Sequence, residues 1–454
     1  MIKIREISRK ILNRLSLVFI LLLIIISGAT SNALGGIKER NSPNDIAVVV
    51  KEDGLWKVNL SKLGEDINLD KKGVFKSPRI SPEGKVVAYT KDGSLYIVSI
   101  DSPKGDKQPI KISDKIVSYS WADKDNLVYS TEKGGLSGFN LKSKKSSIYI
   151  NSENRYEGIE GDRLGTIYSE LYRYYTKDGQ EYIEHKGVIS YDLSKGEQRV
   201  VVPSKPISED DLGLTPRVAG ISKDGAYVYI WRRVHSASIN SDGVPLGVYE
   251  VKSNNFKTFD DKGVFALSYS DNLTINPLDG SIAVLNNGGL RNMNINKTLV
   301  KLNARDQSFT PILPDEMIAS NQPYGPTTKG MVTMTPSFSP DGKKIIFAAS
   351  NTNEDASKWL KEPHNIYSVD IDTKKVEKLT KGDNFDFYPI YISKGRSIVF
   401  ARLTGKDEIS LYKLQDNKEE SIVGNISLRD ENGYSSSYYG HYNLENVLDI
   451  YVSN

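Results

Sequence analysis

The sequence lacks cysteine altogether, and it has few signs of long helices or of a large excess of either charge. With no cysteine among 454 residues, disulfides, thiol catalysis and thiolate metal sites are excluded. No segment after the N-terminus repeats apolar residues at helical spacing, so a helical domain is not predicted. The formal net charge is +3, and basic residues close to the N-terminus account for it. The rest of the chain lacks the basic surface typical of nucleic-acid binding, so nucleic acid is excluded as a partner.

The N-terminus has the pattern of an export signal. Basic residues such as Arg9 and Arg14 precede an apolar stretch at 15–26, and Ser31-Asn32-Ala33 offers the small residues typical of a cleavage site. The stretch is shorter than the roughly 20 residues that a helix needs to cross a bilayer. We therefore expect a signal peptide over 1–33, with an uncleaved anchor through residues 15–29 as the alternative, and a short linker over 34–44. In either case the remainder is expected to be exported, extracellular or associated with the cell envelope.

The residues that are abundant favour strands and turns. There are 26 Tyr against 12 Phe, together with 36 Gly, and aromatic and β-branched residues favour strands while Gly, Asn and Asp favour turns. The run Ser339-Pro340-Asp341-Gly342 is typical of a tight turn before a strand, and related runs begin at Ser81, Ser222 and Pro277. Such recurrence indicates one supersecondary unit repeated along the chain. The residues predicted to have a structural role in these turns are Pro82, Gly84, Asp224, Gly225, Asp279, Gly280, Pro340, Asp341 and Gly342.

Each repeat continues with strands of recurring form. An apolar-Tyr-x-apolar strand occurs at 95–98, 248–251, 366–369 and 411–414, and a polar hairpin and a fourth strand follow it. Four antiparallel strands in each repeat predict an all-β fold, a β-propeller with four-stranded blades, as a single domain over 45–454. Whole units are expected near 77–113, 117–150, 163–204, 215–261, 265–313, 335–382 and 387–425. Fragments at 45–69 and 446–452 would pair in one shared blade and close the ring, which gives eight blades, with seven as the alternative.

The segment 339–382, with its Ser-Pro-Asp-Gly turn and its Ile366-Tyr367-Ser368-Val369 strand, resembles the propeller repeat of TolB. It is also similar to the propellers attached to prolyl-oligopeptidase-type peptidases. The chain departs from both families, because it lacks the α/β domain that precedes the TolB propeller and the Gly-x-Ser-x-Gly turn of the peptidases. The resemblance implies a stand-alone exported propeller of the kind that serves as a binding platform, and it implies no cofactor.

Candidate binding residues lie near three lengthened connections between second and third strands, at about 175–187, 234–247 and 350–365. These connections are expected on one rim, opposite the Ser-Pro-Asp-Gly turns, and insertions on one face often mark a binding face. Exposed loop histidines are favoured over a metal site, because no metal-ligand spacing is present. The candidates are His185, His235 and His364 within the connections, Trp231, Arg232 and Trp359 beside them, and Tyr438 and Tyr439 in a Tyr-rich segment near the C-terminus.

These features predict a non-catalytic scaffold at the cell envelope that binds another envelope protein or a cell-wall polymer. The alternative is a propeller hydrolase or lyase that acts on extracellular glycans through an acidic pair near the central channel. A signal-anchored sensor domain is a third reading. A cluster of acidic, basic or histidine side chains at the channel would favour the enzyme.

Overall fold

The computed structural model describes residues 44–453, apart from 63, 101–107, 290, 292–293, 295–296, 319–329, 354 and 430–440. The predicted signal peptide and most of the linker, and also Tyr438 and Tyr439, lie outside the described residues. Helical structure within the described part is confined to single turns. They are α2 (Ala237–Asn240), α3 (Ala356–Trp359), η2 (Asp260–Lys262), η3 (Ser270–Asn272), η4 (Asp315–Met317), η5 (Ser393–Gly395) and η6 (Leu444–Asn446).

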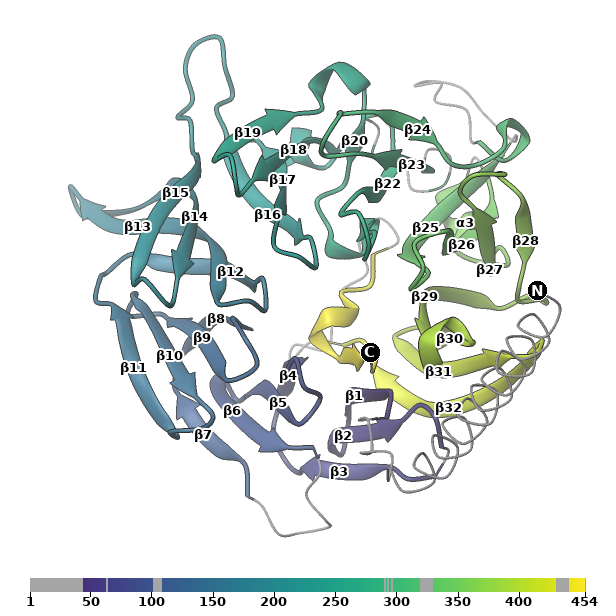
Figure 1. The fold of residues 1–454 in the computed structure, drawn as a ribbon, viewed down its shortest axis with the longest axis horizontal. Helices are drawn as coiled ribbons and strands as arrows, with labels where there is room; N and C mark the ends of the chain where they lie inside the picture. Colours follow the sequence, from purple (N-terminus) through teal and green to yellow (C-terminus); the bar gives the residue numbers. More distant parts are fainter. Residues whose placement is uncertain are drawn as a thin grey trace, which may run out of the picture. The chain divides into compact units, whose positions relative to one another are not determined.

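Most strands form four-stranded antiparallel sheets that follow one another along the chain and stand around a common centre (Figure 1). The first sheets comprise β4 (Phe75–Ile80), β5 (Val86–Lys91), β6 (Ser94–Ser99) and β7 (Ile110–Ser113); β8 (Ile116–Trp121), β9 (Asn126–Thr131), β10 (Leu136–Asn140) and β11 (Lys145–Ile150); and β12 (Arg155–Gly161), β13 (Thr166–Lys177), β14 (Gln180–Asp192) and β15 (Glu197–Pro203). The next comprise β16 (Thr215–Ile221), β17 (Tyr227–Arg233), β18 (Val244–Glu250) and β19 (Asn255–Thr258), with β20 (Phe265–Ala266) paired to β18; β21 (Leu273–Ile275), β22 (Ile282–Asn286), β23 (Thr298–Leu302) and β24 (Phe309–Pro311); and β25 (Met331–Phe338), β26 (Lys344–Asn351), β27 (Asn365–Asp370) and β28 (Val376–Lys378).

The remaining strands are joined in one larger sheet that contains both ends of the domain. It comprises β29 (Phe385–Ile392), β30 (Ser397–Gly405), β31 (Glu408–Gln415), β32 (Lys418–Ser427), β1 (Ile46–Lys51), β2 (Gly54–Asn59), β3 (Ile67–Asp70) and β33 (Leu448–Tyr451). Strand β33 pairs antiparallel with β1, from Ile46 opposite Tyr451 to Val49 opposite Leu448. The first and last strands of the described chain therefore share one sheet.

The predicted all-β class and four-stranded antiparallel units are confirmed, with one correction in the third unit. That unit begins at β12, well before the predicted start at 163, because Tyr156-Glu157-Gly158-Ile159 carries no turn signal that marks it as a first strand. The lengthened connection at 175–187 is also not a loop. It is the continuation of β13 and β14 in register beyond the sheet, to a turn at Asp178 and Gly179.

The Ser-Pro-Asp-Gly turns form as expected. Gly84, Gly225, Gly280 and Gly342 each have φ between 67° and 70°, a left-handed conformation that glycine adopts without steric cost. In the copy that begins at Ser339, its hydroxyl accepts from the backbone N–H of Lys344 at 2.9 Å, which ties the turn to the next strand. The turns therefore fix the register between the first and second strands of these sheets.

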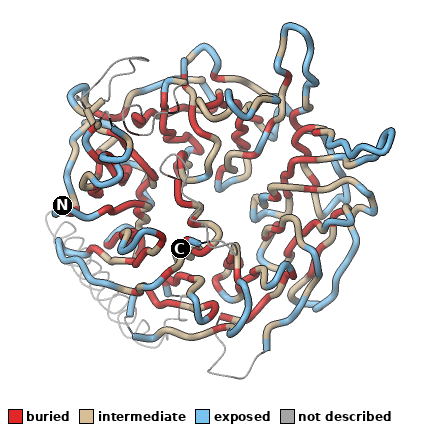
Figure 2. Tube along the Cα trace, turned by 180° about the vertical axis from the view of Figure 1, so that it is seen from behind, coloured by how far each residue is buried: buried red, intermediate tan, exposed pale blue. Residues whose placement is uncertain are grey.

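The recurring tyrosine of the third strand has a structural role. Tyr96, Tyr367 and Tyr412 each stack on an aromatic ring directly opposite on the second strand, with centroids 5.8–6.0 Å apart. Such cross-strand aromatic pairs stabilise sheets. Figure 2 shows that buried residues gather in the strands toward the middle of each sheet, whereas outer strands and connections are exposed.

Asp45 joins three separate segments of the chain. Its carboxylate accepts hydrogen bonds from the backbone N–H groups of Ser393, at 2.5 Å, and Ser453, at 2.8 Å, and from both serine hydroxyls. The side chain is buried, with 2% exposure. The residue at the start of β1 therefore holds the end of β29 and the C-terminal residues in place.

We predict that Asp45→Ala lowers the free energy of unfolding by about 2–4 kcal/mol, since hydrogen bonds to a charged group contribute about 1.5–3 kcal/mol each and are not additive. Denaturant unfolding of the purified domain would measure the change. Glu181→Ala, at an exposed position of β14, is the control and should change stability by less than about 0.5 kcal/mol. Equal stability of the two variants would contradict the role given to Asp45.

Candidate functional site

A polar cavity of about 600 Å³ lies where the sheets converge. Its walls come from the first strand of several sheets, because these strands lie closest to the centre, and from the C-terminal segment 443–449. The charged, hydroxyl-bearing and amide side chains that line it are Arg79, Ser118, Tyr119, Ser120, Glu160, Arg163, Arg217, Ser268, Tyr269, Ser270, Tyr388, Asn443, Glu445 and Asp449. The site is thus assembled from residues distant in the sequence.

A second cavity of about 580 Å³ adjoins the first and shares Ile80, Gly161, Arg163, Ile221 and Asp449 with it. Its other lining residues include Pro82, Ser222 and Pro277, which belong to the Ser-Pro-Asp-Gly type turns. The central cavity therefore extends toward the face that carries the turns. The sequence predicted a binding face opposite these turns, whereas this cavity lies on their side, because the first strands end in these turns and bring them around the channel.

A β-bulge recurs in the strands that line the channel. The register shifts next to Ser77 in β4, Gly158 in β12, Thr335 in β25 and Tyr388 in β29, and all four residues have φ between 46° and 55°. A bulge reverses which face the following side chains occupy, and bulges are common next to active sites. Here the bulges precede Arg79 and Glu160, so both side chains line the cavity.

Proline residues in the sequence indicate three of these bulges, although the turn and strand patterns did not reveal them. Ser77, Thr335 and Tyr388 are each followed by proline, a few residues before the end of a first strand. Proline has no N–H for a ladder hydrogen bond, and inside a strand it indicates an edge or a bulge. The repeated residue-proline pair ahead of the turn therefore marks the channel lining.

Arg79 lies among carboxylates. One guanidinium nitrogen, Nη1, donates to the backbone carbonyl of Glu445 at 3.0 Å. Burial opposes the positive charge, but Tyr119, Asp449 and Glu160 offset this effect and the pKa of Arg79 is raised. A permanent positive charge is therefore fixed beside the channel carboxylates.

Glu160 and Glu445 have pKa shifts of opposite sign. The Glu160 side chain is exposed to the channel. The many protein atoms that surround the channel desolvate its carboxylate and raise its pKa, against the opposing charges of Arg79 and Arg217. Burial alone would also raise the pKa of Glu445, but the His441 side chain interacts with its carboxylate and the pKa is lowered. The pKa values of these two carboxyl groups are thus shifted in opposite directions.

His441 links the C-terminal segment to the opposite side of the channel. Its Nδ1 lies 2.6 Å from Oδ1 of Asp271, and its Nε2 lies 3.8 Å from Oε1 of Glu445. The ring stacks on Tyr269 with centroids 4.1 Å apart and is only 2% exposed. Burial would lower the pKa, but the two carboxylates raise it to about 9, so the ring is a buried cation at neutral pH.

Arg217 is held by a buried acid behind the channel wall. Its Nε lies 3.3 Å from Oε1 of Glu170, whose side chain is 7% exposed. The other carboxylate oxygen accepts from the Tyr172 hydroxyl at 2.8 Å. His185 packs edge-on against Tyr172, with centroids 4.7 Å apart, and is 7% exposed. The expected loop position of His185 is therefore wrong, because it lies in β14 in the layer that supports Arg217.

Of the other predicted binding residues that the structure describes, three are buried and two are not. Trp231, Trp359 and His364 are at most 1% exposed; His364 stacks on Phe385 at 3.8 Å between centroids. An exposed rim is therefore the wrong setting for these three, since Trp231 lies within β17 and the connection that carries Trp359 and His364 folds back onto the sheets. Arg232 forms an ion pair with Asp260. His235 alone among the described histidines is exposed, and its Nε2 lies 3.1 Å from the carbonyl of Lys205.

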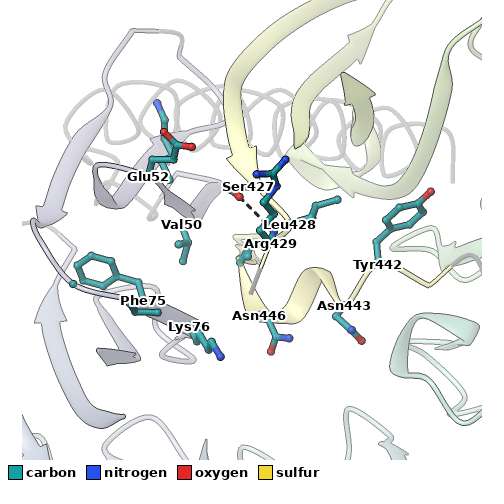
Figure 3. A pocket seen from close by; sticks show the side chains of 14 residues that line it. Val50, Glu52, Phe75, Lys76, Ser427, Leu428, Arg429, Tyr442, Asn443 and Asn446 are labelled. Carbon is teal, nitrogen blue, oxygen red and sulfur yellow. Dashed lines mark hydrogen bonds between the residues drawn. The ribbon is translucent and has the colours of Figure 1, made fainter. Parts of the chain in front are cut away.

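Figure 3 shows another cavity, of about 370 Å³, bordered by β1, the start of β4 and the end of β32. Phe75 and Tyr442 lie on opposite sides of it, and the backbone N–H of Arg429 donates to the Ser427 hydroxyl at 3.3 Å. Glu52 is the sole carboxylate among its described lining residues. It therefore lacks the paired acids of the central cavity.

Across the described part of the chain, no three His, Asp or Glu side chains are grouped as metal ligands, and no helix is long and apolar enough to span a bilayer.

Comparison with known proteins supports a propeller-like fold. No protein-family model and no curated protein matches the sequence. Among solved structures, the chain is similar to dipeptidyl peptidase 4 of Porphyromonas gingivalis, with a TM-score of 0.53 and 8% identity over 87% of this chain. It is also similar to a prolyl endopeptidase, with a TM-score of 0.46 and 10% identity over 77% of this chain. The chain covers 61% and 49% of the length of these two proteins.

A manganese-bound oligogalacturonate lyase is a further similar structure, with a TM-score of 0.44 and 10% identity over 82% of this chain and 89% of that one. The prediction of a non-catalytic scaffold is contradicted by the likeness to dipeptidyl peptidase 4, which is an enzyme. Identities this low establish the fold and not the reaction. The resemblance to TolB in particular stays a prediction.

The charge on His441 should make stability depend on pH. Its folded-state pKa of about 9 exceeds the ordinary value of 6.5, so its contribution is complete below about pH 6.5 and is lost as the pH rises through 9. At about 1.4 kcal/mol per pKa unit, we expect a loss of up to about 3 kcal/mol. Thermal unfolding between pH 6 and pH 10 would measure it.

The control for this prediction is His441→Gln, which lacks the contribution of the imidazole, so that its stability relative to the unmodified protein should rise as the pH rises through 9. Buried Lys297, whose pKa is lowered to about 8 by burial, works in the opposite direction and is present in both proteins. The difference between the two curves therefore isolates His441. Parallel curves would contradict its assignment as a buried cation.

Proposed function

We propose that this protein is an acid–base enzyme that cleaves an extracellular glycan in the central channel. The observation that carries the proposal is the pair Glu160 and Glu445, which face one cavity and have pKa shifts of opposite sign. Such a pair is the arrangement by which carboxyl groups divide the roles of general acid and base. A glycosidic bond requires both, since the leaving oxygen must gain a proton and water must lose one.

In the proposed hydrolysis, protonated Glu160 gives its proton to the glycosidic oxygen as the bond from that oxygen to the anomeric carbon breaks. The Glu445 carboxylate takes a proton from a water molecule, whose oxygen forms the new bond to the anomeric carbon. Arg79 offsets the negative charge of the carboxylates, and His441 keeps Glu445 ionised. Elimination in place of hydrolysis is recognised by the ultraviolet absorbance of an unsaturated product.

The lining of the cavity supports a sugar polymer as substrate. Hydroxyl groups from Ser118, Ser120 and Ser270 line it together with Tyr269 and Tyr388. Sugars present hydroxyls for such polar groups and apolar ring faces for aromatic side chains. The predicted signal over 1–33 supports an extracellular site of action, and a cell-wall polymer is the substrate class that this location offers.

We further infer that the fold is a ring of eight blades in which the two ends of the domain share the last one. The support is the pairing of β33 with β1, beside β2 and β3. A single bridge, from Lys51 to Ile426, connects this group to β32. A blade built from both ends leaves no open sheet edge at the ring closure.

Glu160→Gln tests the proposed acid directly. We expect turnover of a sensitive glycan to fall by roughly 10²- to 10⁴-fold, because the amide has no acidic proton to give. The unmodified protein should lose activity on the alkaline side of its profile, above the ordinary glutamate value of 4.5, as Glu160 ionises. Release of reducing ends from purified wall glycans and polyuronates would measure both effects.

Glu157→Gln is the matched control. Glu157 stands on the same strand, and its Oε1 accepts from the Tyr174 hydroxyl at 2.8 Å, a bond that the amide oxygen can also accept. It is not among the residues that line the cavity. Full activity in Glu160→Gln, or equal loss in both variants, would refute the acid role of Glu160.

A further inference from the structure

Arg163 is positioned where the central cavity meets the cavity on the turn face, and it lines both. The loop that carries it is fixed by its neighbours. The Asp162 carboxylate accepts from the backbone N–H of Leu164 at 2.7 Å and of Thr166 at 2.9 Å, and Gly165 donates to the carbonyl of Ala122 at 2.9 Å. Arg163 itself has φ 65°. The side chain is therefore presented by an ordered turn.

The charge of Arg163 has no hydrogen-bonded or ion-paired partner in the described part of the chain, in contrast to the other two arginines of the channel. Arg217 is paired with Glu170, and Arg79 donates to the carbonyls of Pro78 and Glu445. The Asp162 carboxylate next to Arg163 is already engaged with backbone donors. An exposed guanidinium at the entrance is thus available to an anion.

All three arginines line the central cavity together with Glu160. All three charges act on Glu160, with Arg79 and Arg217 acting more strongly than Arg163. A guanidinium binds planar or tetrahedral oxyanions through two parallel N–H donors. A substrate group held by Arg163 would lie beside the proposed acid while the rest of the polymer extends toward the turn face.

We propose that the glycan bound here is anionic, and that Arg163 binds its carboxylate or phosphodiester group at the channel entrance with Arg217 as the second positive charge. This inference rests on the proposed function, because it names the substrate class of the same site. A uronic-acid polymer and a phosphodiester-linked wall polymer carry the same oxyanion chemistry, so the experiment must tell them apart.

Binding is measured on the full chain carrying Glu160→Gln, so that turnover does not interfere. The probes are a uronic-acid oligomer, poly(glycerol phosphate) and a neutral oligosaccharide of similar length, titrated by calorimetry. We expect one anionic probe to bind at least 10-fold more tightly than the neutral one, and the probe that binds identifies the source. Adding Arg163→Ala should weaken that binding at least 10-fold, with partial recovery in Arg163→Lys.

Arg199→Ala is the control, because Arg199 is exposed on β15 and pairs with Glu197 at 2.8 Å. It should leave the binding unchanged. The inference is overturned if the neutral probe binds equally well, if neither anionic probe binds, or if Arg163→Ala has no effect. Loss of turnover in Glu160→Gln together with unchanged binding in Arg163→Ala would retain the enzyme and reject the anionic substrate. Full turnover in Glu160→Gln together with weakened binding in Arg163→Ala would reject the acid role of Glu160 and retain the anionic ligand.

Discussion

The C-terminal segment, held at the centre of the sheets, is the feature on which the rest of the site depends. Backbone pairing of β33 with β1 and the hydrogen bonds from Ser453 to Asp45 fix its end. Two further bonds fix its course: Val50 donates to the carbonyl of Val447 at 2.8 Å, and Ile80 donates to the Asp449 carboxylate at 2.6 Å. Residues 441–449 supply three of the charged groups in and beside the channel, namely His441, Glu445 and Asp449. The pairing of the two ends of the domain therefore also positions the charged groups at its centre.

The bulged first strands supply the charged side chains that face the C-terminal segment across the site. An unbroken strand would alternate its side chains strictly between the two faces of a sheet. The extra residue at Ser77 or Gly158 interrupts that alternation and turns Arg79 or Glu160 toward the axis. A Cβ at Gly158 would lie 2.9 Å from the Glu170 carboxylate, so the carboxylate would have to shift. The acid that supports Arg217 and the bulge that turns Glu160 are therefore packed against each other.

The charged side chains in and beside the channel are balanced by neighbouring side chains of opposite charge. His441 lies between Asp271 and Glu445, and Arg79 lies beside Glu160 and Asp449. Charges that are withdrawn from water interact strongly, and they shift each other's pKa in opposite directions. The same balance leaves Arg163 without a described partner at the entrance. An internal network of paired charges thus lies next to one exposed cation, and the proposed anionic substrate rests on this contrast.

The sequence alone determined the repeat, the strand order within most units and the turns, because these follow from local preferences. Gly342 needs its left-handed φ, and Tyr367 needs an aromatic partner one strand away, whatever the rest of the chain does. The sequence also indicated that the ends at 45–69 and 446–452 would meet. It did not locate the site, and its exposed-rim interpretation of His185, Trp359 and His364 was wrong, because burial depends on how long connections fold back. Only the tertiary structure decided that Glu160 and Glu445 line one cavity, since residues so far apart in the chain come together solely through the arrangement of sheets around the centre.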